Sequence, residues 1–195
     1  MLIETKVNMR KLVIALFFII TTITSQAQEK VNWIGFEEAI ALSKKEPKSI
    51  LVDLYTDWCG WCKKMDATTY KNKAIIKYIN ENFYAVKMDG EGKEKITYQG
   101  KVFNYVEYTK ANGRKGKYHE FTQAIFNSGK KPGERKGGSY PSTAVFNKKG
   151  QFMQVIPGYK KSPEFEKLLA FFGENIYEEK PLPWPEFEKN FKSAL

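Results

Sequence analysis

Two cysteines, Cys59 and Cys62, are the residues whose type and spacing are best suited to chemistry. They are the only cysteines among 195 residues, and they stand three positions apart in Trp58-Cys59-Gly60-Trp61-Cys62. A thiolate attacks a disulfide, and a second thiol within reach then resolves the mixed disulfide. A purely structural bond is the weaker interpretation, because the loop it closes is too short to restrict the unfolded chain much. The spacing therefore predicts a redox-active pair.

The residues around the motif would position this pair. The apolar run from Ile50 to Tyr55 precedes it and predicts a strand buried on both faces of a sheet. The helix that the motif opens is expected over Lys63 to Thr69. At the start of a helix, free backbone N–H groups and the helix dipole favour a thiolate. One turn later the second cysteine shares the same face, so we predict that Cys59 is the nucleophile and Cys62 the resolving thiol.

The rest of the chain predicts a β-α-β unit followed by a β-hairpin and a helix, which is an α/β domain containing a parallel pair of strands. Apolar residues at helical spacing predict the helices, and short apolar runs predict the strands. Helices are expected over Trp33 to Lys45, over Lys73 to Asn82 and from Ser162 onward; strands are expected over Phe83 to Met88, Ser142 to Asn147 and Gln151 to Ile156.

A basic segment from Gly90 to Ser139 separates these two halves. It predicts a hairpin over Glu94 to Tyr108 and a helix over Tyr118 to Phe126, and its aromatic residues predict that it packs against the domain. Residues 90–140 hold eleven Lys and Arg against five Asp and Glu, whereas the whole chain has a net charge of +10. One hypothesis is that this lobe selects an acidic protein substrate or redox partner; the other is a solvated basic face.

The N-terminus has the pattern of a signal peptide. Arg10 and Lys11 precede an apolar run from Leu12 to Ile20, and small residues lead up to Ala27. The pattern predicts a signal peptide over residues 1–27, cut after Ala27, and a periplasmic or secreted protein. An uncleaved anchor is the alternative, but the run is shorter than the ~20 residues that span a bilayer.

The order of the motifs resembles the thioredoxin superfamily. The matching segments are Ile50-Leu51-Val52-Asp53, Trp58-Cys59-Gly60-Trp61-Cys62-Lys63, Tyr140-Pro141-Ser142 and Phe146 to Gly150. The chain is most similar to exported thioredoxin-like proteins related to the reductase domain of transmembrane disulfide reductases. This resemblance implies a thioredoxin-like fold, a central mixed β-sheet flanked by helices, with the insertion placed before a cis-proline loop. The expected domain covers residues 28–180 with the insertion at about 90–139, and residues 181–195 form a C-terminal tail.

The resemblance also implies roles for residues around the cysteines. Asp53 matches a buried acid that accepts a proton when Cys62 attacks, and Pro141 matches the cis-proline that presents backbone to the substrate. Trp61 is a departure, because thioredoxin has proline there and the residues between the cysteines tune the reduction potential. The expected substrate-binding residues are Trp58, Gly60, Trp61, Tyr140, Pro141 and Ser142.

The sequence thus predicts a thiol–disulfide oxidoreductase that reduces disulfides of exported proteins. It needs no cofactor beyond its own disulfide, and its partners are protein substrates and a redox partner, with neither nucleic acid nor, after signal cleavage, a membrane. No metal is expected, because zinc needs three or four protein ligands and the chain offers two cysteines and the distant His119. The alternative is a redox-inert binding or assembly module that recognises a partner through the basic insertion.

Overall fold

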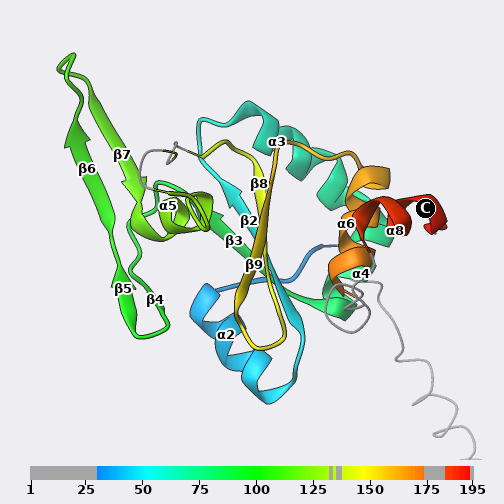
Figure 1. Cartoon of the computed structure of the whole chain (residues 1–195). Helices are drawn as coiled ribbons and strands as arrows, with labels where there is room; N and C mark the ends of the chain where they lie inside the picture. Colours follow the sequence, from blue (N-terminus) through cyan, green and yellow to red (C-terminus); the bar gives the residue numbers. More distant parts are fainter. Residues whose placement is uncertain (1–29, 132–133, 135–137, 174–182, 194–195) are drawn as a thin grey trace, which may run out of the picture.

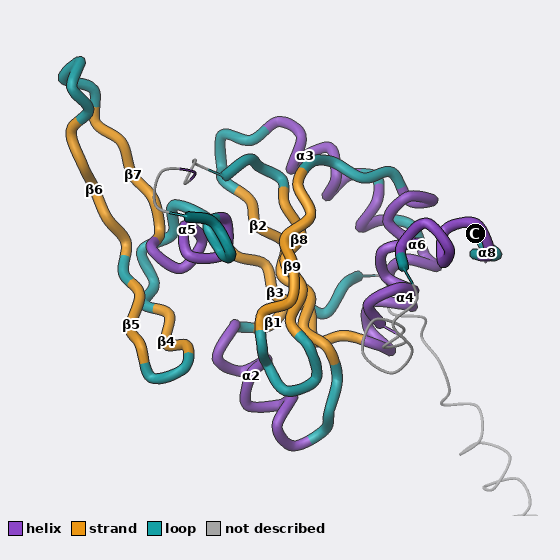
Figure 2. Tube along the Cα trace, viewed as in Figure 1, coloured by secondary structure: helices purple, strands orange, loops and turns teal. Residues whose placement is uncertain are grey.

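A five-stranded mixed sheet forms the centre of the molecule (Figures 1 and 2). The computed structural model describes residues 30–131, 134, 138–173 and 183–193, so the predicted signal peptide lies outside the described residues. The strand order is β1-β3-β2-β8-β9, with β3 parallel to β1 and β2, and with β8 antiparallel to β2 and β9. The strands are β1 (Trp33–Ile34), β2 (Ser49–Tyr55), β3 (Phe83–Asp89), β8 (Ser142–Phe146) and β9 (Phe152–Pro157).

Helices cover both faces of this sheet (Figure 1). They are α2 (Phe36–Lys45), α3 (Gly60–Ala67), α4 (Lys73–Asn82), α6 (Ser162–Gly173) and α8 (Trp184–Asn190), with a short 3-10 turn, η1 (Thr69–Lys71). Apolar side chains from α3, α4, α6 and α8 share one core with Leu51 of β2. The neighbouring residues of the same strand, Ile50 and Val52, face a second core shared with α2. The alternation follows from the two-residue period of a strand and confirms the predicted architecture.

The insertion packs over the second core, as its aromatic residues predicted. It contains β4 (Ile96–Tyr98), β5 (Lys101–Phe103), β6 (Tyr105–Thr109), β7 (Lys115–His119) and α5 (Glu120–Phe126). Two antiparallel ribbons result, β4 with β5 and β6 with β7. Phe103, Phe121 and Ile125 are buried among side chains of α2 and β2. The β6–β7 ribbon, called the arm below, projects beyond the rest of the molecule (Figure 1).

Two expectations about element boundaries were wrong. Trp33 does not begin a helix, because Trp33 and Ile34 take the parallel edge position beside β3 and the helix starts at Phe36. The strand expected to run through to Tyr108 is broken at Asn104. There the backbone N–H donates to the Glu120 carboxylate at 2.8 Å, and the backbone carbonyl accepts from the Glu120 N–H at 2.9 Å.

Two helices also begin at other residues than the sequence predicted. The motif helix begins at Gly60 rather than Lys63, and the insertion helix begins at Glu120 rather than Tyr118. Beyond the predicted domain boundary, the tail contains α8, whose Phe187 is buried against the core formed by α4 and α6. Within the described part of the chain, no helix is both long and apolar enough to cross a membrane.

Candidate active site

The two cysteines form a disulfide at the start of α3. Cys59 is the N-cap residue of that helix, and its Sγ accepts a hydrogen bond from the Cys62 backbone N–H at 3.1 Å. The S–S distance between Cys59 and Cys62 is 2.05 Å. Both cysteines are 4% exposed, so an attacking group reaches them only from the rim of the site. The bond therefore sits where the helix N-terminus stabilises a thiolate once the pair is reduced.

Asp53 lies on the strand that leads into the motif, on the face of the sheet that α3 covers. It is 2% exposed, and its register partners are Lys87 on β3 and Thr143 on β8. The Lys87 ammonium lies 3.1 Å from Oδ2 of Asp53. Within the described residues, Oδ1 of Asp53 has no hydrogen-bond partner. This carboxylate therefore retains an unused acceptor oxygen inside the protein.

Burial controls the charge of this acid. Desolvation raises the pKa of Asp53 from 3.8 to about 6, although the ammonium of Lys87 opposes the shift. Lys87 also donates to Asp66, which stands four residues after Cys62 on the same face of α3. One cation therefore joins the buried carboxylate of β2 to a second carboxylate on α3, the helix that contains Cys62.

Aromatic rings surround the ammonium of Lys87. Its Nζ lies 5.3 Å from the centroid of the Trp33 ring, 5.1 Å from that of Tyr55 and 5.6 Å from that of Tyr70. These faces stabilise a cation that is partly removed from water. The pKa of Lys87 is raised, because the two carboxylates outweigh the effect of its burial. Lys87 therefore stays charged and holds its position between Asp53 and Asp66.

The Tyr140–Pro141 peptide bond is cis, as the resemblance to thioredoxins implied. The Pro141 carbonyl accepts from the Gly158 N–H at 2.8 Å, and the Ser142 hydroxyl donates to the Ser139 carbonyl at 2.7 Å. The Ser142 side chain thus closes the loop before Pro141 and is itself buried. A contribution of Ser142 to substrate binding stays a prediction and would involve its backbone.

Two aromatic pairs connect the cysteine segment to neighbouring loops. Trp58 packs edge-on against Tyr140 with ring centroids 6.0 Å apart, and Trp61 lies over Tyr159 at 5.6 Å. Trp58 and Trp61 are 65% and 58% exposed, so both rings form an apolar rim beside the buried disulfide. Lys64 places its ammonium 4.8 Å from the Trp61 ring centroid. The surface around the disulfide therefore suits an extended peptide with apolar side chains.

Gly60 and Gly90 keep space open at this rim. A Cβ on Gly60 would meet no atom within 4 Å, so its surface is free for an approaching chain. At Gly90 a Cβ would lie 1.9 Å from the Tyr140 hydroxyl, so only glycine lets the Tyr140 ring pack there. Gly90 ends the strand that carries Lys87, and the insertion begins at the same residue. The insertion is thereby tied to the cis-proline loop.

His119 has a structural position in this fold. It caps α5 by accepting from the Phe121 N–H at 3.1 Å, and its Nε2 lies 2.8 Å from the Glu94 carbonyl. One ring nitrogen therefore caps the helix and the other contacts the Glu94 carbonyl. In the part of the chain that the structure describes, no group of three or more His, Cys, Asp or Glu side chains is placed to hold a metal. The absence of a metal cofactor stays a prediction.

Sequence reasoning missed Lys87, Asp66, Tyr70 and Tyr159. A signal for Lys87 was present, since it is a lone charge inside the apolar strand Phe83 to Met88. An isolated charge in a buried strand requires a partner, and Asp53 was the available carboxylate on the neighbouring strand. A signal for Asp66 was also present, because it stands four residues after Cys62 and therefore shares a helix face with it. Tyr159 had no comparable signal, because its contact with Trp61 depends on how two loops meet.

Fold and site together define a thioredoxin-fold protein of the thiol–disulfide oxidoreductase class. Residues 21–126, more than half of the chain, match the family Thioredox_DsbH, described as "Protein of unknown function, DUF255". The chain belongs to this family.

Individual relatives agree with this assignment. The chain is 32% identical over 89 residues to Spermatogenesis-associated protein 20 of Mus musculus, an alignment that covers 45% of the chain and 11% of that protein. It is 28% identical over 53 residues to the thiol:disulfide interchange protein DsbD of Pseudoalteromonas atlantica, covering 27% of this chain and 9% of DsbD. The chain thus spans only about a tenth of the length of these curated relatives.

A solved structure supports the fold independently of sequence. A thioredoxin-fold protein from Helicobacter pylori superposes with a TM-score of 0.50 and 16% sequence identity. The superposition covers 85% of this chain and 89% of that protein. At this identity the likeness concerns the arrangement of helices and strands, and it confirms the fold class inferred from the order of the motifs.

Proposed function

We propose that this protein reduces disulfide bonds of exported proteins through its Cys59–Cys62 dithiol. The observation that carries the proposal is the combination of three features: Cys59 at the N-cap of α3, the disulfide to Cys62, and the buried acid Asp53 on the strand that leads into the motif. A structural disulfide would need neither a buried acid of raised pKa nor an exposed aromatic rim. These features suit exchange chemistry at a protected sulfur pair.

In the proposed reaction the reduced enzyme supplies two electrons to a substrate disulfide. The Cys59 thiolate attacks one substrate sulfur, a mixed disulfide forms, and the other substrate sulfur leaves as a thiolate. Cys62 then loses its proton to Asp53 and attacks Cys59 Sγ. The second substrate thiolate is released and the Cys59–Cys62 bond closes. An external dithiol donor must reduce this bond again before another turnover.

The reducing direction is supported by the similarity to DsbD and by the absence of histidine between the two cysteines. Export is supported by the N-terminal pattern of residues 1–27, which lies outside the described residues. The substrates are proposed to be extended peptide segments, because the rim of Trp58 and Trp61 is apolar and exposed. Backbone pairing beside the cis Tyr140–Pro141 bond would hold such a segment next to the sulfurs.

The test is the reduction potential of the pair, measured in glutathione buffers by tryptophan fluorescence. Trp58 and Trp61 flank the cysteines and report on the bond. A potential near or below about −230 mV is expected for a reductase, whereas a value of about −120 to −180 mV would assign an oxidase or isomerase. A pair that forms no reversible disulfide would instead favour the redox-inert binding module. The Cys59→Ser, Cys62→Ser double variant supplies the fluorescence baseline.

A further inference from the structure

The arm formed by β6 and β7 has two unlike faces. Residues that pair directly across the two strands share a face of the ribbon. One face, which lies toward the segment 90–95, therefore carries Tyr105, Glu107, Lys117 and His119. That face contacts the domain at two points: Lys117 pairs with Glu91 at 3.1 Å, and Lys93 lies over the Tyr105 ring at 5.6 Å. The arm is thus anchored to the domain on this side.

The other face carries Val106, Tyr108 and Tyr118, of which Tyr108 is exposed and the other two are half-buried. Val106 and Tyr118 are register partners, and Tyr108 stands opposite Gly116. Tyr108 is 44% exposed, and its ring lies over Gly116 so closely that a Cβ there would be 2.4 Å away. The Tyr108 and Tyr118 rings touch with centroids 5.8 Å apart. A short strip of two tyrosine rings, tilted by 59° to each other, therefore lies on one face of a ribbon that projects from the molecule (Figure 1).

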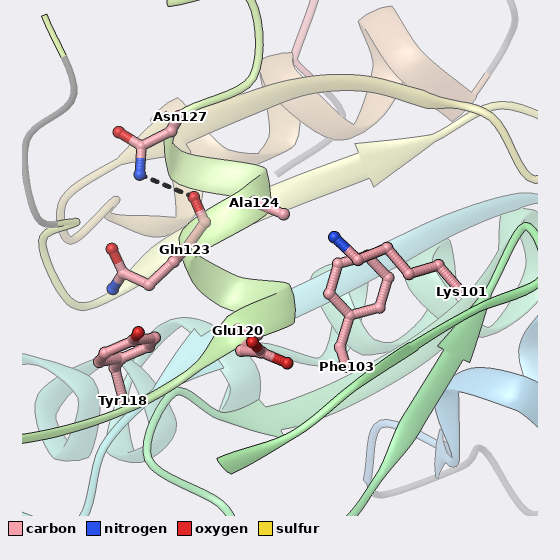
Figure 3. A pocket seen from close by; sticks show the side chains of 7 residues that line it. All are labelled: Lys101, Phe103, Tyr118, Glu120, Gln123, Ala124 and Asn127. Carbon is pink, nitrogen blue, oxygen red and sulfur yellow. Dashed lines mark hydrogen bonds between the residues drawn. The ribbon is translucent and has the colours of Figure 1, made fainter. Parts of the chain in front are cut away.

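At the base of the arm this strip opens into a cavity of about 440 Å³ between β5 and α5 (Figure 3). Tyr118 belongs to both the strip and the cavity wall. Phe103 lines the apolar side, while Lys101, Gln123 and Asn127 bring polar groups to the rim. Lys101 holds its ammonium 4.7 Å from the Phe103 ring centroid. Glu120 also lines the cavity, so the cavity suits an apolar side chain, and an anionic neighbour is favoured only on the Lys101 side.

The arm, residues 105–119, is basic because it holds four Lys and Arg residues against one acid, Glu107. Glu107 accepts from the Tyr105 hydroxyl at 2.7 Å, and Glu120 accepts from the Asn104 N–H at 2.8 Å. At the exposed tip, Lys110, Arg114 and Lys115 form no ion pair with any residue that the structure describes. No acid stands between these cations in the sequence. An approaching anionic chain therefore meets uncompensated positive charge.

The backbone of the arm is also open to pairing. β6 and β7 form a ribbon of two strands only, and β6 is its outer member (Figure 1). A two-stranded ribbon is marginally stable in water, and a third strand on its free edge satisfies the unpaired backbone groups. Pairing of this kind gives affinity through the main chain and specificity through alternate side chains.

We propose that the arm is a docking site for an extended acidic segment of a partner protein. The segment adds a strand to the free edge of β6, its apolar residues lie on Tyr108 and Tyr118, and its acids meet the tip cations. This inference adds the class of partner to the proposed function. It rests on that function only for the thiol–disulfide exchange that follows docking. Partner choice and disulfide chemistry then use different surfaces.

The test uses the full mature chain and a fluorescent peptide of alternating Glu and Val, long enough to pair with all of β6. A peptide of alternating Lys and Val is the control probe. Anisotropy is expected to show binding of the acidic peptide alone, weakening as salt increases. The Arg114→Glu, Lys115→Glu variant should bind about ten-fold more weakly. The matched control, Lys44→Glu, Lys45→Glu in exposed positions of α2, should bind within about two-fold of the wild type.

Further readouts make each result decisive. Tyr108→Ser should also weaken binding while circular dichroism stays unchanged, and amide shifts on titration should centre on Tyr105–Thr109. Equal binding of both peptides, or shifts confined to the Trp58 and Trp61 rim, would overturn the proposal. Self-association abolished by the same arm variants would assign the surface to a second copy. Reduction of a small synthetic disulfide should persist in all arm variants; its absence from the wild type would refute the proposed function and leave docking standing.

Discussion

Replacing Asp53 by asparagine is expected to stabilise the oxidised protein at alkaline pH. Burial raises the pKa of Asp53 from 3.8 to about 6, so the charged form is less favoured in the folded protein than in the unfolded chain. The free energy of unfolding therefore falls as pH rises from below 3.8 to above 6. Asparagine carries no charge, so the variant does not lose this part of the free energy of unfolding as pH rises. Lys87 retains Asp66 as a partner in the variant, so no isolated cation is created.

The size of the effect follows from the two pKa values. One pKa unit corresponds to about 1.4 kcal/mol, so the ionised wild-type protein loses about 3 kcal/mol at pH 8. At pH 4 the same linkage leaves a loss below about 1 kcal/mol. Shape differences between the carboxylate and the amide add an offset that does not vary with pH. The advantage of Asp53→Asn should therefore grow by about 2.5 kcal/mol between pH 4 and pH 8.

Urea unfolding without reductant, repeated across this pH range, measures the difference. Gln154→Asn is the control, because Gln154 is exposed and the change alters no ionisable group. It should leave the pH dependence of the wild type unchanged. An Asp53→Asn advantage that varied by less than about 0.5 kcal/mol from pH 4 to pH 8 would refute the reasoning. So would an advantage that shrank as pH rose, since that would mean the carboxylate is stabilised by its surroundings.

Three further predictions concern exchange at the site. Cys62→Ser should accumulate a mixed disulfide through Cys59, visible as a mass gain that reductant removes; equal accumulation by Cys59→Ser would contradict the assigned roles. Gly90→Ala should displace the Tyr140 ring and cost about 1–3 kcal/mol in urea unfolding, and an unchanged midpoint would show that the ring is not confined. Trp61→Ala should change the free energy of unfolding by less than about 1 kcal/mol, because the ring is mostly exposed. The same variant should raise KM for peptide disulfides more than for small disulfides. Equal changes in KM would argue against substrate binding by the rim.

The parts of the fold that sequence predicted are those with strong local patterns. Lys73–Asn82 was predicted to the residue, because Ile75, Ile76 and Ile79 mark one helix face and Asn72 caps its start. The strand through Ile50 was equally clear, since a continuous apolar run of that length is buried on both faces. In these segments the local pattern of side chains is enough to determine the secondary structure.

The errors arose where tertiary contacts override local preference. Trp33 and Ile34 could continue a helical pattern, but pairing with β3 at the sheet edge satisfies their backbone instead. The break at Asn104 depends on Glu120, which is sixteen residues away and belongs to the next helix. The spacing of residues within one segment does not identify partners that are distant in the sequence. The contact between Trp61 and Tyr159 was beyond reach for the same reason.

The separation of the arm from the disulfide has a consequence for how specificity would arise. The rim of Trp58 and Trp61 offers apolar surface and little charge selectivity, so it would accept many extended peptides once they arrive. The arm offers uncompensated cations and a free strand edge, which act on encounter and orientation. Its tip projects away from α3 (Figure 1), so the proposed docking surface is separate from the helix that Cys59 caps. A chain with both surfaces can therefore keep a general exchange chemistry while its partners are selected elsewhere.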